Sequence, residues 1–107
     1  MTLNELKEAL DTLAWREQVE FEMSERSPKV SAELARTTNE EIRQLAQGVT
    51  PKLLDTLQKE EAYIAWVIRL SPFVPGDQTK NRAHRLVHHP DGEVRYWAAR
   101  AIEQSDS

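Results

Sequence analysis

The chain has 107 residues, a formal net charge of -4, 39% hydrophobic and 30% charged residues, and no cysteine. This length fits one domain with a modest core, and the lack of cysteine excludes a disulfide framework, a thiol nucleophile and a thiolate metal site. No apolar run approaches the ~18 residues that a membrane span requires, and the N-terminus lacks the features of a secretory signal, so we expect a single helical domain over residues 1–107 in the cytoplasm.

The first part of the chain predicts two helices. A stripe of leucines follows a Thr2–Glu5 capping box, which predicts an amphipathic helix over about 3–23. Ser27-Pro28 pairs a capping serine with a proline at the first helical position, so a second helix is expected over about 28–47. A further capping box at Thr38 offers an alternative, in which this helix breaks near residue 37 and restarts.

The middle of the chain predicts a shorter pair. Thr50-Pro51 repeats the same start signal, and a helix over about 51–59 is expected. Segment 61–70 is apolar on nearly every side, which is typical of a helix that is buried on more than one side. Pro72 ends it, because the residue before a proline leaves the helical region. We expect 61–70 to be the central helix of the domain.

The last part of the chain predicts a third pair, over about 79–88 and 92–104, separated by a short corner with Pro90 and Gly92. Asp77 or Thr79 is expected to cap the first of these helices. Apolar residues of that helix are expected to point inward, whereas its basic residues are expected to point outward. These basic residues are Lys80, Arg82 and Arg85.

Residues 86–102 resemble a HEAT-like repeat, the helix-turn-helix unit of α-solenoids. The matching pattern is Pro90-Asp91, then Val94-Arg95, then Ala98-Ala99 and Ala101-Ile102. The resemblance implies that Asp91 and Arg95 form a structural ladder between repeats, and that the valine and alanines face the core. Asp91 is also placed to cap the helix that follows it.

We therefore predict an all-α fold, a short HEAT-like stack of three helical hairpins. The hairpins cover residues 3–47, 51–70 and 79–104. A compact, irregular helical bundle is the alternative arrangement of the same helices.

Aromatic and arginine side chains indicate where a partner would bind. Core packing is the expected role of Trp15 and Trp97. In solenoids the second helix of each pair lines the concave face, and the outward strips of those helices contain the candidate partner-binding residues Tyr63, Trp66, Arg69, Tyr96 and Arg100. Interface hot spots favour such side chains. Burial of Trp66 is the alternative, because its helix is apolar all round.

Three histidines cluster beside the corner. His84 and His88 are four residues apart, the spacing of a zinc pair on one helix face, and His89 follows. The interval lacks the glutamate of the metalloprotease motif, and a solvated helix end accounts for the cluster. The chain also lacks a glycine-rich phosphate loop and a nucleophile elbow. We therefore expect no metal, no cofactor and no enzymatic activity.

Charge is unevenly distributed: residues 1–62 carry 13 acidic and 8 basic side chains, whereas residues 63–107 carry 5 and 6. The acidic first part argues against nucleic-acid binding. We expect a non-catalytic module that binds a protein partner through the second helices of its hairpins. The alternatives are an inhibitor or immunity-type protein that uses its acidic N-terminal half, and a small enzyme or nucleic-acid-binding HEAT-like domain. Self-association through an exposed end of the stack stays open.

Overall fold

The computed structural model describes residues 1–105, and every regular element in this range is helical. The predicted all-α class is therefore confirmed. The chain divides into two compact units, one of residues 1–45 and one that begins at residue 46. The single domain predicted over residues 1–107 stays a prediction. None of the helices in the described range is both long enough and apolar enough to cross a membrane.

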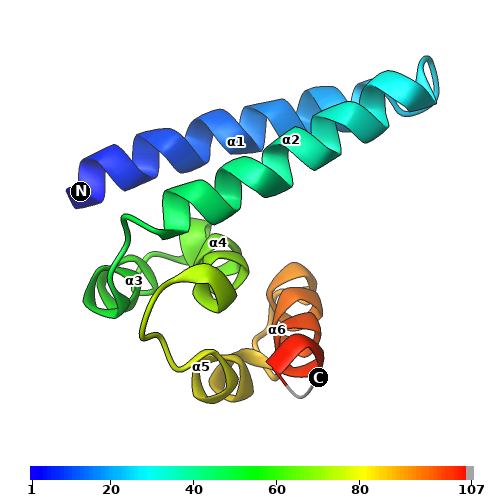
Figure 1. Ribbon diagram of the computed structural model, residues 1–107. Coiled ribbons are helices and arrows are strands. Elements are labelled where there is room, and N and C mark those ends of the chain that lie inside the picture. The colour runs from blue at the N-terminus through cyan, green and yellow to red at the C-terminus, as the bar shows by residue number, and fades with distance from the viewer. Residues whose placement is uncertain (106–107) are drawn as a thin grey trace. The chain divides into compact units, whose positions relative to one another are not determined.

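The first unit is a helical hairpin. Helix α1 covers Leu3–Met23 and helix α2 covers Pro28–Ala46, and the two lie side by side in opposite directions (Figure 1). Thr2 caps α1, since its Oγ1 accepts a hydrogen bond from the Glu5 N–H at 3.2 Å, as the capping box predicts. Both helices agree with their predicted bounds to within one residue.

Polar contacts join α1 to α2. The Arg16 guanidinium forms an ion pair with the Glu41 carboxylate, and the Ser31 hydroxyl donates a hydrogen bond to the Glu20 carbonyl at 3.2 Å. The predicted leucine stripe of α1 is buried at three positions, Leu6, Leu10 and Leu13. The hairpin therefore combines one apolar stripe with polar contacts along its length.

Helix α2 is continuous, so the alternative with a break near residue 37 is wrong. The Thr38 side chain is buried, and its hydroxyl has no hydrogen-bond partner among the described residues. A capping threonine would instead direct its hydroxyl to a free backbone N–H at a helix start. Ile42 and Ala46 follow Thr38 at four-residue spacing and are also buried. Thr38 therefore belongs to the buried face of α2 and does not start a new helix.

Helix α1 leaves its aromatic side chains in solvent. Trp15, which the sequence places in the core, is 67% exposed, and Phe21 is 79% exposed. The reason is helical geometry: Trp15 stands two residues after the buried Leu13, hence about 200° further round the helix. The prediction of a core role for Trp15 is therefore wrong.

The second unit is built from shorter helices. Helix α3 covers Pro51–Leu57, and α4 covers Ile64–Leu70. One 3₁₀ turn, η1 (Glu61–Tyr63), precedes α4, and another, η2 (Ser71–Phe73), follows it. The helix predicted over 51–59 ends two residues earlier, at Leu57, and the segment predicted over 61–70 begins as a 3₁₀ turn. Ser71, which was expected to leave the helical region before Pro72, keeps helical backbone angles and begins η2 instead.

Helices α5 (Thr79–Leu86) and α6 (Gly92–Ser105) form the final pair, and α6 packs against both α5 and α4. These three helices share one apolar core. Its buried members are Ile64, Ile68, Ala83, Leu86, Val94, Ala98 and Ala101. The inward positions predicted for α5 and α6 are confirmed where they belong to this core.

Replacing Thr38 by valine removes a buried hydroxyl that has no partner and keeps the shape of the side chain. Because an unpaired buried polar group costs roughly 1–3 kcal/mol, we expect Thr38→Val to raise the free energy of unfolding, measured by urea denaturation, by about 1 kcal/mol. Thr37→Val is the matched control: the Thr37 hydroxyl is exposed and donates to the Glu33 carbonyl at 3.0 Å, so a change below about 0.5 kcal/mol is expected. A destabilised Thr38→Val protein would contradict this account of the hydroxyl.

Candidate functional site

Helices α4 and α6 bring arginine and tryptophan side chains together. The guanidinium carbon of Arg69 lies 4.3 Å from the ring centroid of Trp66 and 4.3 Å from that of Trp97. Trp66 and Arg69 are three residues apart on α4, so they share a face of that helix, and the packing of α6 on α4 supplies Trp97. Electrostatic attraction between the cation and the two ring faces holds the Arg69 guanidinium in place.

The cluster continues along α6. The Arg100 guanidinium carbon lies 5.6 Å from the ring centroids of both Tyr96 and Trp97, and its Nη1 donates a hydrogen bond to Tyr96 Oη at 2.8 Å. The Tyr96 and Trp97 rings meet edge to face, with centroids 5.1 Å apart and an interplanar angle of 77°. We call this cluster the arginine–aromatic stack; its members are Trp66, Arg69, Tyr96, Trp97 and Arg100.

The stack extends from the protein interior to the surface. Trp66 is 8% exposed, whereas Tyr96 is 53% exposed. Arg69 and Trp97 are half-buried between these two, and Arg100 is exposed. Tyr96 and Arg100 also line a shallow depression on the outward face of α6, together with Ala99, Glu103 and Gln104. The surface therefore presents a phenol ring and a guanidinium whose positions are supported from beneath.

The structure brings four of the five predicted partner-binding residues into the stack. Trp66 is buried beneath Arg69 instead of lying on an outward strip, because α4 is apolar on nearly every side. Tyr63 lies half-buried in η1, the 3₁₀ turn that precedes α4. Trp97 is the member that the sequence reasoning missed, although it stands three residues before Arg100, a spacing that brings two side chains together on a helix.

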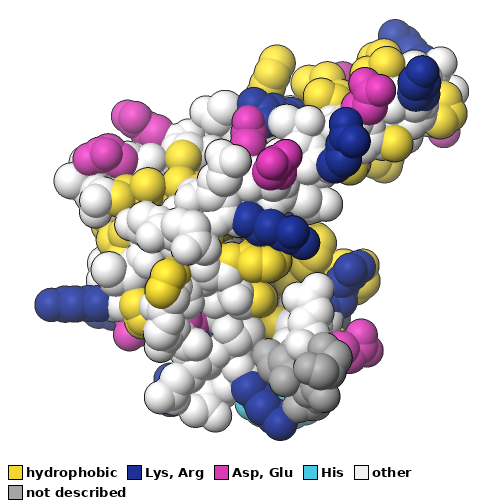
Figure 2. Space-filling view, viewed as in Figure 1, with side chains coloured by type: hydrophobic (Ala, Val, Ile, Leu, Met, Phe, Trp, Pro, Cys, Tyr) yellow, Lys and Arg dark blue, Asp and Glu magenta, His cyan; other side chains and the backbone are white. Residues whose placement is uncertain are grey.

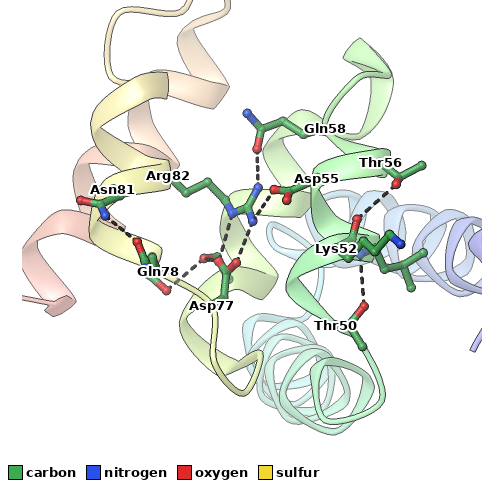
Figure 3. A network of polar contacts seen from close by, with 12 residues as sticks. Thr50, Lys52, Asp55, Thr56, Gln58, Asp77, Gln78, Asn81 and Arg82 are labelled. Carbon is green, nitrogen blue, oxygen red and sulfur yellow. Dashed lines mark hydrogen bonds and ion pairs between the residues drawn. The ribbon is translucent and has the colours of Figure 1, made fainter.

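A second polar cluster surrounds Arg82 of α5 (Figure 3). Its Nε and Nη2 donate to the two carboxylate oxygens of Asp77, at 3.0 and 2.7 Å. Nη2 also lies 2.9 Å from Asp55 Oδ1 on α3, and Nη1 donates to Gln58 Oε1 at 2.6 Å. A single guanidinium thus connects α3, the loop that precedes α5, and α5 itself.

The Arg82–Asp77 pair lies under the protein surface, with side chains 10% and 2% exposed. The Ser71 hydroxyl contributes further bonds, to the Asp77 carboxylate and to Thr79 Oγ1. Burial by itself lowers the pKa of the Arg82 guanidinium, but hydrogen bonds and charge attraction from Asp77, and then from Asp55, outweigh it and raise the pKa above its ordinary value. Arg82 is therefore held as a cation.

This network corrects two sequence predictions. Arg82, which was expected to point outward, is buried, and neither Asp77 nor Thr79 caps α5: the capping residue is Gln78, whose side chain makes no capping bond. Asp77 stands one residue before the capping position, and its carboxylate forms a bidentate, charge-assisted bond with Arg82 instead. Helical spacing carried a signal for this, because Arg82 stands four residues before the buried Leu86.

The Arg82 network borders an open cavity of about 250 Å³. Its charged lining includes Asp55 and Asp77, which both bond to Arg82, and Arg85, which is exposed. Groups that neutralise each other in this way stabilise a structure more readily than they activate a substrate. We therefore assign the network a structural role.

The corner between α5 and α6 contains the two predicted ladder residues. Asp91 Oδ1 accepts a hydrogen bond from the Glu93 N–H at 2.8 Å, which confirms its predicted capping role. Arg95 Nη1 donates to the carbonyls of His89 and Pro90, both at 2.8 Å. These bonds brace a single corner, and the ladder of Asp91 and Arg95 between repeats stays a prediction.

The histidines lie at the same end of the unit. His84 and His88 are exposed, and His89 Nδ1 accepts a hydrogen bond from the Asp91 N–H at 3.0 Å. Within the part of the chain that the structure describes, no three His, Cys, Asp or Glu side chains are grouped so that they could hold a metal ion. The local role visible for this cluster is the bond between His89 and the corner backbone.

Comparison with known protein families, curated proteins and solved structures finds no match to this chain. The resemblance to HEAT-like repeats therefore stays a prediction. A fold by itself does not imply a function, so we infer the function from the chemistry of the arginine–aromatic stack.

Replacing Arg82 by methionine leaves the Asp77 carboxylate buried without its cation. Removing one partner of a buried pair is strongly destabilising, so we expect Arg82→Met to lower the free energy of unfolding by about 3 kcal/mol in urea denaturation. Arg85→Met, an exposed arginine on the same helix, is the matched control and should change it by less than about 0.5 kcal/mol.

The pairing itself is measured by a double-mutant cycle with Asp77→Asn. The double variant should lose at least about 1 kcal/mol less than the two single losses added together, because it no longer buries an unpaired charge. Additive losses would show that Arg82 and Asp77 act independently, contrary to the bonds between them.

Proposed function

We propose that this protein is a non-catalytic module that binds a protein partner through the outward face of α6. The observation that supports this most directly is the arginine–aromatic stack, which ends at the surface in Tyr96 and Arg100. Tyrosine and arginine are among the side chains most favoured at the energetic centres of protein interfaces.

The side chains of the stack are held in place before any partner binds, and this favours binding. An arginine in solvent samples many rotamers and loses this freedom when it contacts a partner. In this protein Arg100 is bonded to Tyr96 Oη and lies against the Trp97 ring, which in turn contacts Arg69. Part of the entropy loss therefore occurs on folding and not on binding.

The outward face of α6 also suggests the shape of the partner segment. Its lining residues recur at helical spacing, so they form one continuous stripe. A guanidinium that lies against aromatic rings keeps its in-plane N–H groups for acceptors. A segment with a carboxylate that contacts Arg100 and an apolar side chain that contacts Tyr96 would fit this stripe.

Charge and bonding favour this function over the alternatives. Residues 46–107 carry 8 acidic and 8 basic side chains, without the positive excess that nucleic-acid binding requires. The best candidates for catalytic groups, Asp77 and Arg82, neutralise each other. We propose the cytoplasm as the site of action, in line with the sequence expectation.

Affinity purification with single-residue variants tests the proposal. Tyr96→Ala and Arg100→Ala should each reduce recovery of at least one co-purifying protein about tenfold or more, as interface hot spots do. Arg85→Ala is the control for loss of an exposed arginine in the same unit and should leave recovery unchanged. All three proteins should melt at the wild-type temperature by circular dichroism. If every co-purifying protein is recovered equally with Tyr96→Ala and Arg100→Ala, the α6 face is not the binding surface.

A further inference from the structure

Helix α1 presents a second exposed aromatic surface, separate from the α6 face. Trp15 and Phe21 are largely exposed, and Gln18 between them is exposed as well. The three residues follow one another at three-residue spacing, which places them on a single oblique ridge of the helix surface. We call Trp15, Gln18 and Phe21 the α1 aromatic ridge. Two largely exposed aromatic rings on one ridge offer apolar contact area to a partner.

Acidic side chains flank this ridge. Asp11 and Glu22 stand four residues before and seven residues after Trp15, so they share its side of α1. Glu17 stands four residues before Phe21 on α1, and Glu25 lies in the turn that follows the helix. Hydrophobic and charged side chains are mixed on the face of the hairpin that Figure 2 shows. Each exposed ring therefore has at least one carboxylate as a neighbour on the helix.

We propose that the α1 aromatic ridge binds a lysine- and arginine-rich segment of a partner protein. The face of an aromatic ring attracts a cation, and a carboxylate beside the ring adds a charge-assisted hydrogen bond. The aliphatic stems of lysine and arginine would cover the Trp15 and Phe21 rings, while their charged ends reach the flanking carboxylates. A single lysine or arginine side chain could therefore contact both an aromatic ring and a carboxylate of the ridge.

The charge of the first unit favours a basic segment over a second copy of the chain, a membrane surface or a nucleic acid. The first unit, residues 1–45, carries 10 acidic and 6 basic side chains. A second copy of the chain would bring the same negative excess to the ridge. An anionic membrane surface or a nucleic acid would be repelled for the same reason.

Panning a phage-displayed library of random peptides on the full-length protein tests the proposal. We expect the enriched peptides to carry a clear excess of lysine and arginine. Capture of these peptides should fall about tenfold or more on the Trp15→Ala/Phe21→Ala double variant, which corresponds to the loss of one strong contact. Both residues are largely exposed, so the double variant should show the same circular dichroism spectrum and melting temperature as the wild type.

Matched variants separate charge from ring contact and separate this ridge from the α6 face. Glu22→Gln and Glu25→Gln should weaken the binding of a synthetic copy of the most enriched peptide, measured by fluorescence anisotropy, and added salt should weaken it further. Tyr96→Ala should bind this peptide as the wild type does. The proposal is overturned by a library without enrichment, by enriched peptides with no positive excess, by equal capture on the double variant, or by binding that depends on Tyr96 instead.

Discussion

The ion pair between Arg82 and Asp77 is the contact on which the second unit depends. Both side chains lie under the surface, and a buried charge is tolerated only where its partners compensate for the water it has lost. The compensation comes from three different parts of the chain: Asp55 on α3 with Gln58 directly after it, Asp77 in the loop, and Ser71 in η2. Short helices such as α3 and α5 have little stability of their own, so a common polar anchor gives them defined positions in the second unit.

The arginine–aromatic stack uses a related device closer to the surface. There the guanidinium groups of Arg69 and Arg100 lie against the faces of aromatic rings. The two clusters divide the work of the second unit. The Arg82 network is closed on itself and positions helices, whereas the stack ends in exposed side chains, and binding is the role we propose for it.

Patterns that depend on neighbours along the chain were readable from the sequence. The caps at Thr2 and Asp91, the proline helix starts and the leucine stripe of α1 predicted the helices and most of their bounds. Contacts between distant elements could not be predicted, because no residue near Arg82 in the sequence indicates that Asp55 or Gln58 is its partner. The same limit explains why the burial of Trp66 and the exposure of Trp15 were not predicted. The size of an aromatic side chain is known from the sequence, but its burial depends on which helix lies against it. The sequence reasoning found four stack residues and missed that Trp97 joins them.

The three tryptophans of this chain occupy three different environments, and this has an optical consequence. Trp15 is the sole indole of the first unit and stands in water, whereas Trp66 and Trp97 belong to the second unit and lie under or beside the Arg69 guanidinium. An indole in water emits at longer wavelengths than a buried one, because water dipoles relax around its excited state. Each unit of the protein therefore contains its own intrinsic fluorophore, and a water-soluble quencher such as acrylamide extinguishes the signal of the hairpin before that of the helices around Arg69.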